Sequence, residues 1–337
     1  MPLIVGGDVG GTKAYLGLYE VDGTNISPVA VERYVSSDFP GATELLARFI
    51  DHCGRQPDRI VIGVPGPVQH TPVKPVNLPW SIDPEQISNA LGTVEVFLLN
   101  DLEAAAYGTL TLTEDDLVVI NRGEPDPRGG RVVIAAGTGL GEAGLAWSDG
   151  QYVAVPSEGG HASFAPGTEL EAELWRWLFE RHGHVSWERV VSGMGLANIY
   201  EFLRESSPEA EPNWLRTQLT EQGAQARVIS LAAKEARVPL AIEALEIFVS
   251  LYGAEAGNLA LKMLATGGVY VGGGIAPRIL DELMDGTFMD AFAEKGRVSD
   301  VLRRMPVYVI KDDNTALLGA AYFGARMAPH SYVTRTT

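Results

Sequence analysis

The chain has 337 residues, of which 46% are hydrophobic and 20% charged, and its formal net charge is −17 at pH 7. This length exceeds the size at which a single core usually keeps growing, so we expect two domains. The negative charge argues against a nucleic-acid-binding protein, because the sequence has no basic stripe to neutralise a phosphate backbone.

The cysteine content and the apolar segments indicate a cytoplasmic protein. Cys53 is the single cysteine, so no intrachain disulfide can form and a reducing compartment fits. The N-terminus enters a predicted strand almost at once, without the basic and apolar regions of a secretory signal. The most apolar helical stretch, residues 239–263, carries Glu243, Glu246, Glu255 and Lys262. A buried amphipathic helix explains that stretch better than a membrane span, so we expect no membrane association.

The first predicted feature is a β-hairpin over residues 3–18, with a tight turn built on two glycines. Bare backbone N–H groups at such a turn suit a phosphate, and an aspartate at the end of the incoming strand can hold a cation or its waters. The residues available for this role are Asp8, Gly10, Gly11, Thr12 and Lys13. A plain hairpin turn accounts for the glycines equally well.

Alternating strands and helices follow the hairpin. Apolar patterning predicts strands over 29–34, 60–64 and 94–99, and helices over 41–52, from 84, and over 102–107. Asn100 and Asp101 stand between the last of these strands and an alanine-rich helix. Their spacing is typical of a helix N-cap, and it also places a carboxylate at the end of a strand.

The opening pattern then returns. A crossing over residues 111–116 leads to a strand over 118–120, and a polar loop precedes a second glycine hairpin over 132–147. The turn of this hairpin contains Gly137, Thr138 and Gly139. Two glycine hairpins indicate a duplicated βββαβαβα unit, with the two copies facing each other across a cleft.

The rest of the chain completes the second copy and returns to the first. We expect helices over 171–181, from 186, and over 240–264, strands over 269–271 and 306–310, and a last helix over 314–326. Gly272, Gly273 and Gly274 lie between a strand and a helix, where a tight turn needs no further explanation. The last helix can pack on the first domain. The predicted division is therefore a small α/β domain of residues 1–112 plus 312–337 and a large α/β domain of residues 113–311.

Five motifs stand in the same order as in a known family. They are Asp8-Val-Gly-Gly-Thr12, Leu99-Asn100-Asp101, Ala136-Gly-Thr-Gly-Leu-Gly141, Glu158-Gly-Gly-His161 and Gly272-Gly-Gly274. With these motifs the chain resembles, over nearly its whole length, the bacterial glucokinases of the hexokinase-like superfamily. The resemblance implies a two-domain actin-like (ribonuclease H-like) ATPase fold with an interdomain cleft, and usually a homodimer.

The resemblance also implies an activity, which is the phosphorylation of the 6-hydroxyl of glucose by ATP with Mg²⁺. Asp101 would then be the general base that relieves the sugar alcohol of its proton. Sugar hydroxyls would be held by Asn100, Asp101, Glu158, His161 and Glu188. The nucleotide would be held by Asp8, Gly10, Gly11, Thr12, Lys13, Gly137, Thr138, Gly139, Gly272, Gly273 and Gly274, with Asp8 on the metal side.

Simpler interpretations of the sugar residues remain open. Glu158 and His161 can be solvated residues flanking a glycine turn, and Glu188 can be an acid in the first turn of a helix, favoured by the helix dipole. Asn77 and Trp80 can line the sugar side or belong to a surface loop.

One feature separates the chain from the ROK sugar kinases, which share the first hairpin and the Glu-Gly-Gly-His motif. The Cys/His zinc motif of that group is absent, because Cys53 stands alone. Lys13, in contrast, is a ROK-like feature, because the glucokinases often have Asn after the threonine. A kinase for another hexose or an amino sugar, or a sugar sensor without catalysis, remains as an alternative function.

Overall fold

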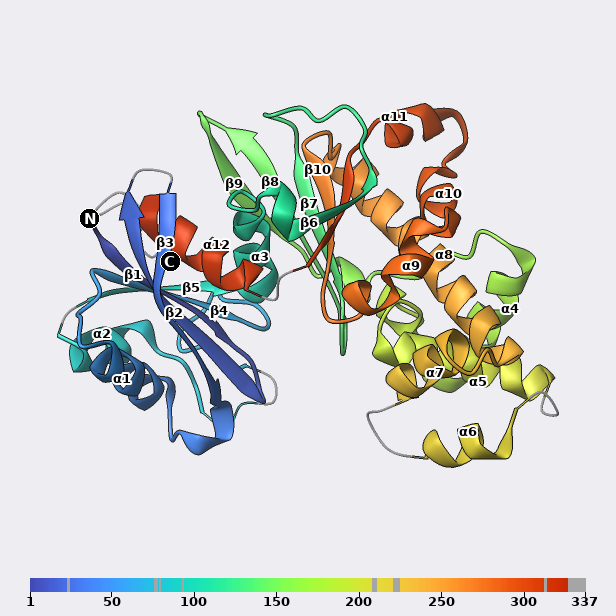
Figure 1. Ribbon diagram of the computed structural model, residues 1–337, viewed down its shortest axis with the longest axis horizontal. Coiled ribbons are helices and arrows are strands. Elements are labelled where there is room, and N and C mark those ends of the chain that lie inside the picture. Colours follow the sequence, from blue (N-terminus) through green and yellow to red (C-terminus); the bar gives the residue numbers. More distant parts are fainter. Residues whose placement is uncertain are drawn as a thin grey trace. The chain divides into compact units, whose positions relative to one another are not determined.

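A computed structural model describes residues 1–22, 25–75, 78, 80–92, 94–207, 211–220, 225–311 and 314–326. The chain divides into two compact units. Unit 1 is made of Met1–Thr113 and Asp312–Thr337, and unit 2 is made of Glu114–Lys311. Figure 1 shows the elements of each unit.

Unit 1 is built on a five-stranded sheet with the order β3-β2-β1-β4-β5. The strands are β1 (Leu3–Val9), β2 (Lys13–Asp22), β3 (Asn25–Val35), β4 (Arg59–Val64) and β5 (Glu95–Asn100). The first three strands are antiparallel, and β4 and β5 run parallel to β1. The helices of this unit are α1 (Ala42–Cys53), α2 (Pro84–Ala90), α3 (Asp101–Gly108) and α12 (Thr315–Arg326).

The helices of unit 1 follow from their sequences. In α1 the apolar residues fall on one face and are buried, and the helix ends at Gly54 in the left-handed conformation. In α2 the Asp83 side chain accepts hydrogen bonds from the first-turn N–H groups, and Pro84 begins the helix.

The last helix, α12, completes unit 1 although it begins more than two hundred residues after the end of α3. It packs against α3 and β1 at glycine positions. A Cβ on Gly319 would overlap the Ala104 carbonyl oxygen, and one on Gly6 would crowd that of Leu317. Glycine at these two places lets the backbones approach closely, so α12 forms part of the unit 1 core.

Unit 2 is built on a six-stranded sheet with the order β6-β11-β10-β7-β8-β9. The strands are β6 (Leu117–Asn121), β7 (Arg131–Ala136), β8 (Leu140–Ser148), β9 (Gln151–Pro156), β10 (Gly268–Gly272) and β11 (Val307–Ile310). The order β9-β8-β7-β10-β11 repeats that of the unit 1 sheet, with antiparallel and parallel pairs at the same places. The strand β6 is an addition, antiparallel to β11.

Helices and short 3₁₀ turns make up the rest of unit 2. The helices are α4 (Glu169–His182), α5 (Gly193–Ser206), α6 (Asn213–Gln218), α7 (Gln225–Lys234), α8 (Pro239–Met263), α9 (Leu280–Met284), α10 (Thr287–Ala293) and α11 (Ser299–Arg303). The 3₁₀ turns used below are η3 (Gly159–His161), η4 (Trp187–Arg189) and η6 (Ala276–Ile279). The long helix α8 packs against α5, α7, α10 and β7 and lies at the centre of the core.

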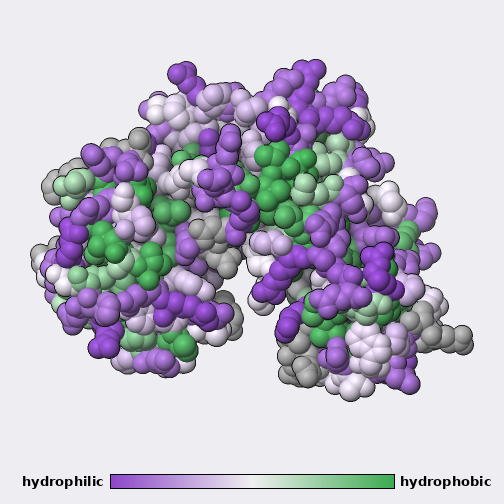
Figure 2. Space-filling view, in the orientation of Figure 1, coloured by the Kyte–Doolittle hydropathy of each residue, from purple (hydrophilic) through white to green (hydrophobic). Residues whose placement is uncertain are grey.

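The predicted amphipathic character of α8 is only partly right. Glu243 and Glu246 are exposed, but the Glu255 side chain is fully buried. Among the described residues, no helix is long and apolar enough to cross a membrane. Hydrophilic residues cover most of the visible surface of each unit, interrupted by hydrophobic areas (Figure 2).

Candidate functional site

The glycine turn between β1 and β2 is held by backbone and hydroxyl contacts. The Gly10 N–H donates to the Lys13 carbonyl at 3.0 Å. Ser36 is buried just after β3. Its hydroxyl donates to the Gly10 carbonyl at 2.7 Å, and its N–H donates to the Thr12 carbonyl at 3.1 Å. These contacts fix the turn while the side chains of Thr12 and Lys13 remain exposed. The sequence around Ser36 carries no local sign of its contact with the turn, so this residue was not predicted.

Asp8 is the next-to-last residue of β1, just before this turn. Burial raises the pKa of its carboxyl to about 6. The carboxyl oxygens make no hydrogen bond or ion pair with the residues that the structure describes. A half-buried carboxylate without a counter-charge fits a divalent cation or its waters, which would restore the charged form.

The junction between β5 and α3 forms a capping box. The Asn100 side chain accepts hydrogen bonds from the N–H groups of Leu102 at 2.9 Å and Glu103 at 3.3 Å, and Glu103 accepts from the Asn100 N–H. The Asn100 amide also donates to the Gly66 carbonyl at 3.2 Å. Asn100 therefore fills the capping role, and Asp101 is the first residue of the helix.

Asp101 is oriented by its own helix. One carboxylate oxygen, Oδ1, accepts from the Leu102 N–H at 2.9 Å, and the residue is half-buried. The positive end of the α3 dipole favours the ionised carboxylate at this position. Such a carboxylate is suited to accept a proton from a substrate hydroxyl.

In unit 2 the turn between β7 and β8 is cross-linked to the start of α5. The Gly137 N–H donates to the Gly139 carbonyl and the Gly193 N–H donates to the Gly137 carbonyl, both at 2.8 Å. Ser192 caps α5 by accepting from the Gly195 N–H at 3.0 Å. Because α5 is a helix of 14 residues, its N-terminus brings a positive dipole end to the Gly137–Gly139 turn.

The glycines after β10 lie against the same turn. Gly273 has a φ of 80°, and a Cβ there would overlap the Ala136 carbonyl oxygen, so only glycine fits without strain. The Ile275 N–H donates to that carbonyl at 3.2 Å. The turns that contain Gly137 and Gly274 are therefore held side by side at the ends of β7 and β10.

A buried tyrosine joins these two strand ends. The Tyr252 hydroxyl, on α8, accepts from the Ala136 N–H at 3.1 Å and lies 3.2 Å from the carbonyl oxygens of Ile134 and Gly272. Burial raises the pKa of this hydroxyl, so it keeps its proton and can donate. Tyr252 thus links the strand that leads to Gly137 with the strand that leads to Gly273.

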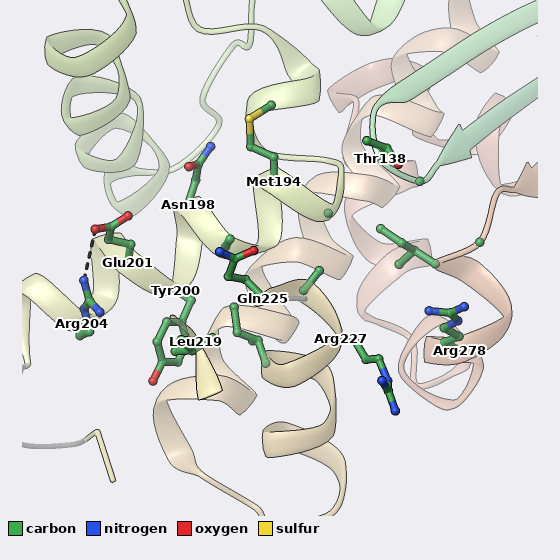
Figure 3. A pocket seen from close by; sticks show the side chains of 17 residues that line it. Thr138, Met194, Asn198, Tyr200, Glu201, Arg204, Leu219, Gln225, Arg227 and Arg278 are labelled. Carbon is green, nitrogen blue, oxygen red and sulfur yellow. Dashed lines mark hydrogen bonds and ion pairs between the residues drawn. The ribbon is translucent and has the colours of Figure 1, made fainter. Parts of the chain in front are cut away.

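A cavity of about 750 Å³ opens at these turns, entirely within unit 2 (Figure 3). Its lining comes from the β7–β8 turn, α5, α7 and the segment after β10, and includes Gly137, Thr138, Gly193, Asn198, Gln225, Arg227, Gly274 and Arg278. The volume lies within the range of pockets that hold small molecules and cofactors. The predicted nucleotide residues Gly137, Thr138 and Gly274 are brought together here.

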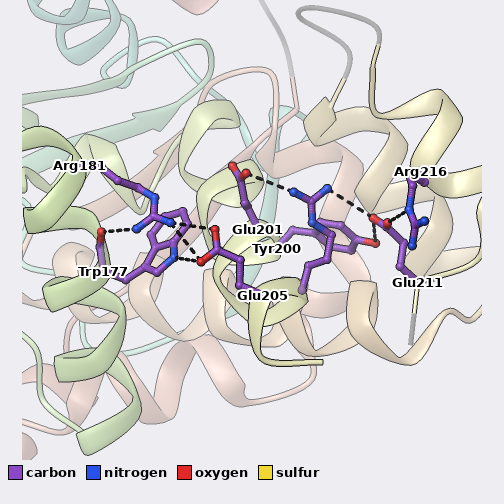
Figure 4. A network of polar contacts seen from close by, with 8 residues as sticks. Trp177, Arg181, Tyr200, Glu201, Glu205, Glu211 and Arg216 are labelled. Carbon is purple, nitrogen blue, oxygen red and sulfur yellow. Dashed lines mark hydrogen bonds and ion pairs between the residues drawn. The ribbon is translucent and has the colours of Figure 1, made fainter. Parts of the chain in front are cut away.

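One end of the cavity is braced by a buried carboxylate. Glu211 is enclosed and accepts from the Tyr200 hydroxyl at 3.1 Å and from Arg216 Nε at 2.7 Å (Figure 4). Arg204 Nη1 lies 3.8 Å from Glu211, and Arg204 Nη2 donates to Glu201 at 3.2 Å. Since Tyr200, Glu201 and Arg204 line the cavity, Glu211 fixes the polar groups at that end.

The Glu158–His161 segment forms the turn η3 on top of β8. Both central glycines are required there, because a Cβ on Gly159 would overlap Glu142 Oε2 and a Cβ on Gly160 would overlap the Leu140 carbonyl oxygen. The close packing leaves Glu158 and His161 exposed at the two ends of the turn. The Glu158 carboxylate makes no hydrogen bond or ion pair with the described residues, so its oxygens can accept from a ligand.

Glu188 connects this turn with the Gly137–Gly139 turn. Its Oε2 accepts from the Leu140 N–H at 3.1 Å and lies where a Cβ on Gly139 would be. Its Oε1 lies 4.0 Å from His161 Nδ1. Glu188 sits in the short turn η4, where a first-turn acid was an open interpretation, and these contacts give it a tertiary role instead.

The predicted site residues are therefore grouped within each unit. Unit 1 holds Asp8, Gly10, Gly11, Thr12, Lys13, Asn100 and Asp101, and unit 2 holds Gly137, Thr138, Gly139, Glu158, His161, Glu188, Gly272, Gly273 and Gly274. Trp80 is buried in the unit 1 core rather than in a surface loop, and Asn77 lies outside the described residues. No group of three or more His, Cys, Asp or Glu side chains in the described part of the chain could hold a metal ion by itself.

Comparison with known proteins gives one consistent match. The model of the family described as Glucokinase matches residues 5–327. The glucokinase of Nostoc punctiforme is 39% identical over 341 residues, covering 97% of this chain and all of the relative.

Solved structures agree on the fold. The crystal structure of a glucokinase from an Antarctic psychrotroph has a TM-score of 0.85 and 30% identity, and covers 96% of this chain and 98% of that one. A ROK family glucokinase from Streptomyces griseus, in complex with glucose and AMPPNP, has a TM-score of 0.64 at 22% identity, covering 95% of this chain and 98% of that one. The predicted actin-like ATPase fold is confirmed.

Proposed function

Because this chain belongs to the glucokinase family, we propose that it transfers the γ-phosphoryl group of ATP to the 6-hydroxyl of glucose. The observation that carries the proposal is the position of Glu188. It links the Gly137–Gly139 turn, which suits phosphates, to the Glu158–His161 turn, which suits a polyhydroxylated ligand.

The cavity in unit 2 is the proposed site for the nucleotide. Backbone N–H groups and the positive end of α5 favour phosphate oxygens near Gly137 and Thr138. Gly274 leaves the backbone bare on the adjoining wall, where adenosine can lie against it. Because the protein is strongly acidic, these dipoles and a metal ion would supply the positive charge that basic residues supply in other phosphate-binding sites.

Mg²⁺ is the proposed cofactor, held directly or through water by Asp8 beside the Gly10–Thr12 turn. When bound, the ion neutralises negative charge on the phosphate oxygens. The burial of Asp8 without a counter-charge supports this assignment. Thr12 and Lys13 would contribute a hydroxyl and a positive charge to the same phosphates.

The proposed sugar site combines carboxylates, an imidazole and an amide. Each sugar hydroxyl both donates and accepts hydrogen bonds, and ionised carboxylates accept strongly. Glu158, His161 and Glu188 are the groups from unit 2, and Asn100 and Asp101 those from unit 1. A sugar that lacks one of the matching hydroxyls would leave a polar group unpaired, which penalises analogues.

Asp101 is the proposed general base. It accepts the 6-hydroxyl proton while the alcohol oxygen bonds to the γ-phosphorus and the bond to the departing ADP breaks. Since the sugar and nucleotide groups come from both units, we infer that transfer requires the units to close on the bound sugar. Closure that depends on the sugar would also keep water from accepting the phosphoryl group.

A coupled assay tests the proposal, with ATP, ADP and polyphosphate as donors, with and without Mg²⁺, across a panel of hexoses and amino sugars. We expect glucose and ATP to give the highest kcat/KM. Asp101→Asn should lower kcat by roughly 10²–10⁴-fold with little change in glucose affinity, because it removes the base and keeps the shape. Asp38→Asn, at an exposed residue of unit 1, is the control.

The outcomes separate the assignments. Near-normal turnover in Asp101→Asn would show that Asp101 is not the base. Glucose binding without transfer from any donor would identify a sensor, and preference for another hexose would correct the substrate. We further infer a homodimer in the cytoplasm, which light scattering of the purified protein and cell fractionation would test.

A further inference from the structure

Two carboxyl groups are buried against each other beneath the Glu158–His161 turn. Glu142, on β8, is 2% exposed, and Glu255, on α8, is fully buried. The two carboxyls are close enough for each to influence the pKa of the other, and a hydrogen bond between them would need a proton on one of them. Neither residue is used in the proposed mechanism, and sequence analysis gave no role to either.

Two lysines face the pair, but neither donates a hydrogen bond to a carboxylate oxygen of it. Lys262 Nζ lies 3.6 Å from Glu255 Oε1, and the Asn258 amide donates to Glu255 Oε2 at 2.7 Å. Lys295, which follows α10 in the chain, also lies near Glu255. Its ammonium donates to the Ala254 carbonyl at 3.0 Å. Glu142 Oε1 has no hydrogen-bond partner among the described residues.

Electrostatics therefore keeps the pair singly charged. Burial, with the charge of Glu255 added to it, raises the pKa of Glu142 to about 8. Burial also raises the pKa of Glu255, while Asn258 and Lys262 oppose that rise. At neutral pH the two carboxyls hold one proton between them, as like charges at close range cannot both ionise cheaply.

The pair is placed where its state affects the turn above it. Glu142 Oε2 occupies the space that a side chain on Gly159 would take. Gly159 is the residue after Glu158 and the first residue of η3. The polar side chains on the turn itself are those of Glu158 and His161, so the position of Gly159 sets where both are presented.

We propose that Glu142 and Glu255, sharing one proton, are positioning residues that hold the Glu158–His161 turn in its sugar-binding form. The inference rests on the proposed function, since it takes this turn to bind the sugar. Loss of the shared proton places two like charges beneath Gly159, and their repulsion and hydration displace the turn. The KM for glucose then rises on the alkaline side while kcat changes less.

The sign of the pH effect follows from the raised pKa. The folded protein holds this proton more tightly than the unfolded chain, so stability falls as the pH rises toward about 8. Glu142→Gln mimics the protonated carboxyl, because the amide donates to Glu255 at every pH. Both the loss of stability and the alkaline rise in KM should therefore be smaller in this variant.

Steady-state kinetics from about pH 6 to about pH 9.5 test the proposal. In the wild-type protein we expect the glucose KM to rise about tenfold above pH 8, corresponding to roughly one lost hydrogen bond to the sugar. In Glu142→Gln the rise should be absent. Glu180→Gln, which removes an exposed carboxylate of unit 2, should behave as the wild type. A flat wild-type profile, or the same rise in Glu142→Gln, would overturn the proposal.

Two further measurements separate this inference from the proposed function. Difference infrared spectroscopy without substrate should show a protonated carboxyl at pH 7 that is lost above pH 8 and is absent from Glu142→Gln. If no such carboxyl is present, the shared proton is refuted whatever the turn binds. If it is present but Glu158→Gln leaves the glucose KM unchanged, the sugar assignment of the turn fails, and the positioning role fails with it.

Discussion

Tyr252→Phe removes the hydroxyl group that links the end of β7 to the end of β10. The hydroxyl is the hydrogen-bond partner of the Ala136 N–H and lies within hydrogen-bond distance of the carbonyls of Ile134 and Gly272. The surroundings are fully buried, so water cannot replace it. An unpaired buried N–H costs about 1–3 kcal/mol, and we expect the free energy of unfolding to fall by about 2 kcal/mol.

The same substitution should weaken nucleotide binding. Ala136 precedes Gly137, and Gly272 precedes Gly273, so loosening these strand ends loosens both turns that line the cavity. We expect the KM for ATP to rise by about three- to tenfold, equivalent to about 1 kcal/mol, with the glucose KM nearly unchanged. Urea unfolding and steady-state kinetics with varied ATP measure the two effects.

Tyr308→Phe is the matched control, because the Tyr308 hydroxyl makes no hydrogen bond with the described residues. Its effect on stability should stay within about 0.5 kcal/mol. If Tyr252→Phe is no more destabilising than this control, the hydroxyl does not join the strands as described. If it is destabilising but leaves the ATP KM unchanged, the cavity is not the nucleotide site or its turns are held by other contacts.

Two other substitutions test the packing. Gly319→Ala should destabilise the protein by about 1–3 kcal/mol in thermal unfolding, because the new methyl group meets the Ala104 carbonyl on α3; unchanged stability would refute the close crossing. Glu211→Gln should lower the free energy of unfolding by about 2 kcal/mol, because it removes the buried negative charge that pairs with Arg216 and Arg204. It should also raise the KM for ATP. An unchanged KM would mean that this end of the cavity does not contact the nucleotide.

Local sequence signals predicted much of the architecture. Glycine pairs between alternating apolar runs located both hairpins, and Asn100-Asp101 before an alanine-rich helix indicated an N-cap. Apolar periodicity located α1 and α8, and small residues near the C-terminus indicated a helix that packs on the first domain. These signals work because each depends on neighbours within a few residues.

Contacts between distant segments were not predictable in the same way. Tyr252 and Ala136 are 116 residues apart, and nothing around Tyr252 distinguishes it from other residues of an apolar helix. Glu255 looked like a residue of a polar helix face, whereas it is buried beside Glu142. Ser36 and Glu211 also act through partners on other elements. A side chain whose role depends on the tertiary fold leaves no periodic or spacing signal.

The return of α12 to unit 1 has a consequence for how the molecule is made. Residues 114–311 leave the ribosome before α12, the helix that packs on unit 1. Unit 2 can therefore fold while the core of unit 1 still lacks this helix. Until then Ile4 and Tyr19, which later pack against Leu317, remain uncovered on the nascent chain. A premature stop codon just before Thr315 would therefore damage the unit 1 sheet, whose strands all precede residue 101 in the sequence.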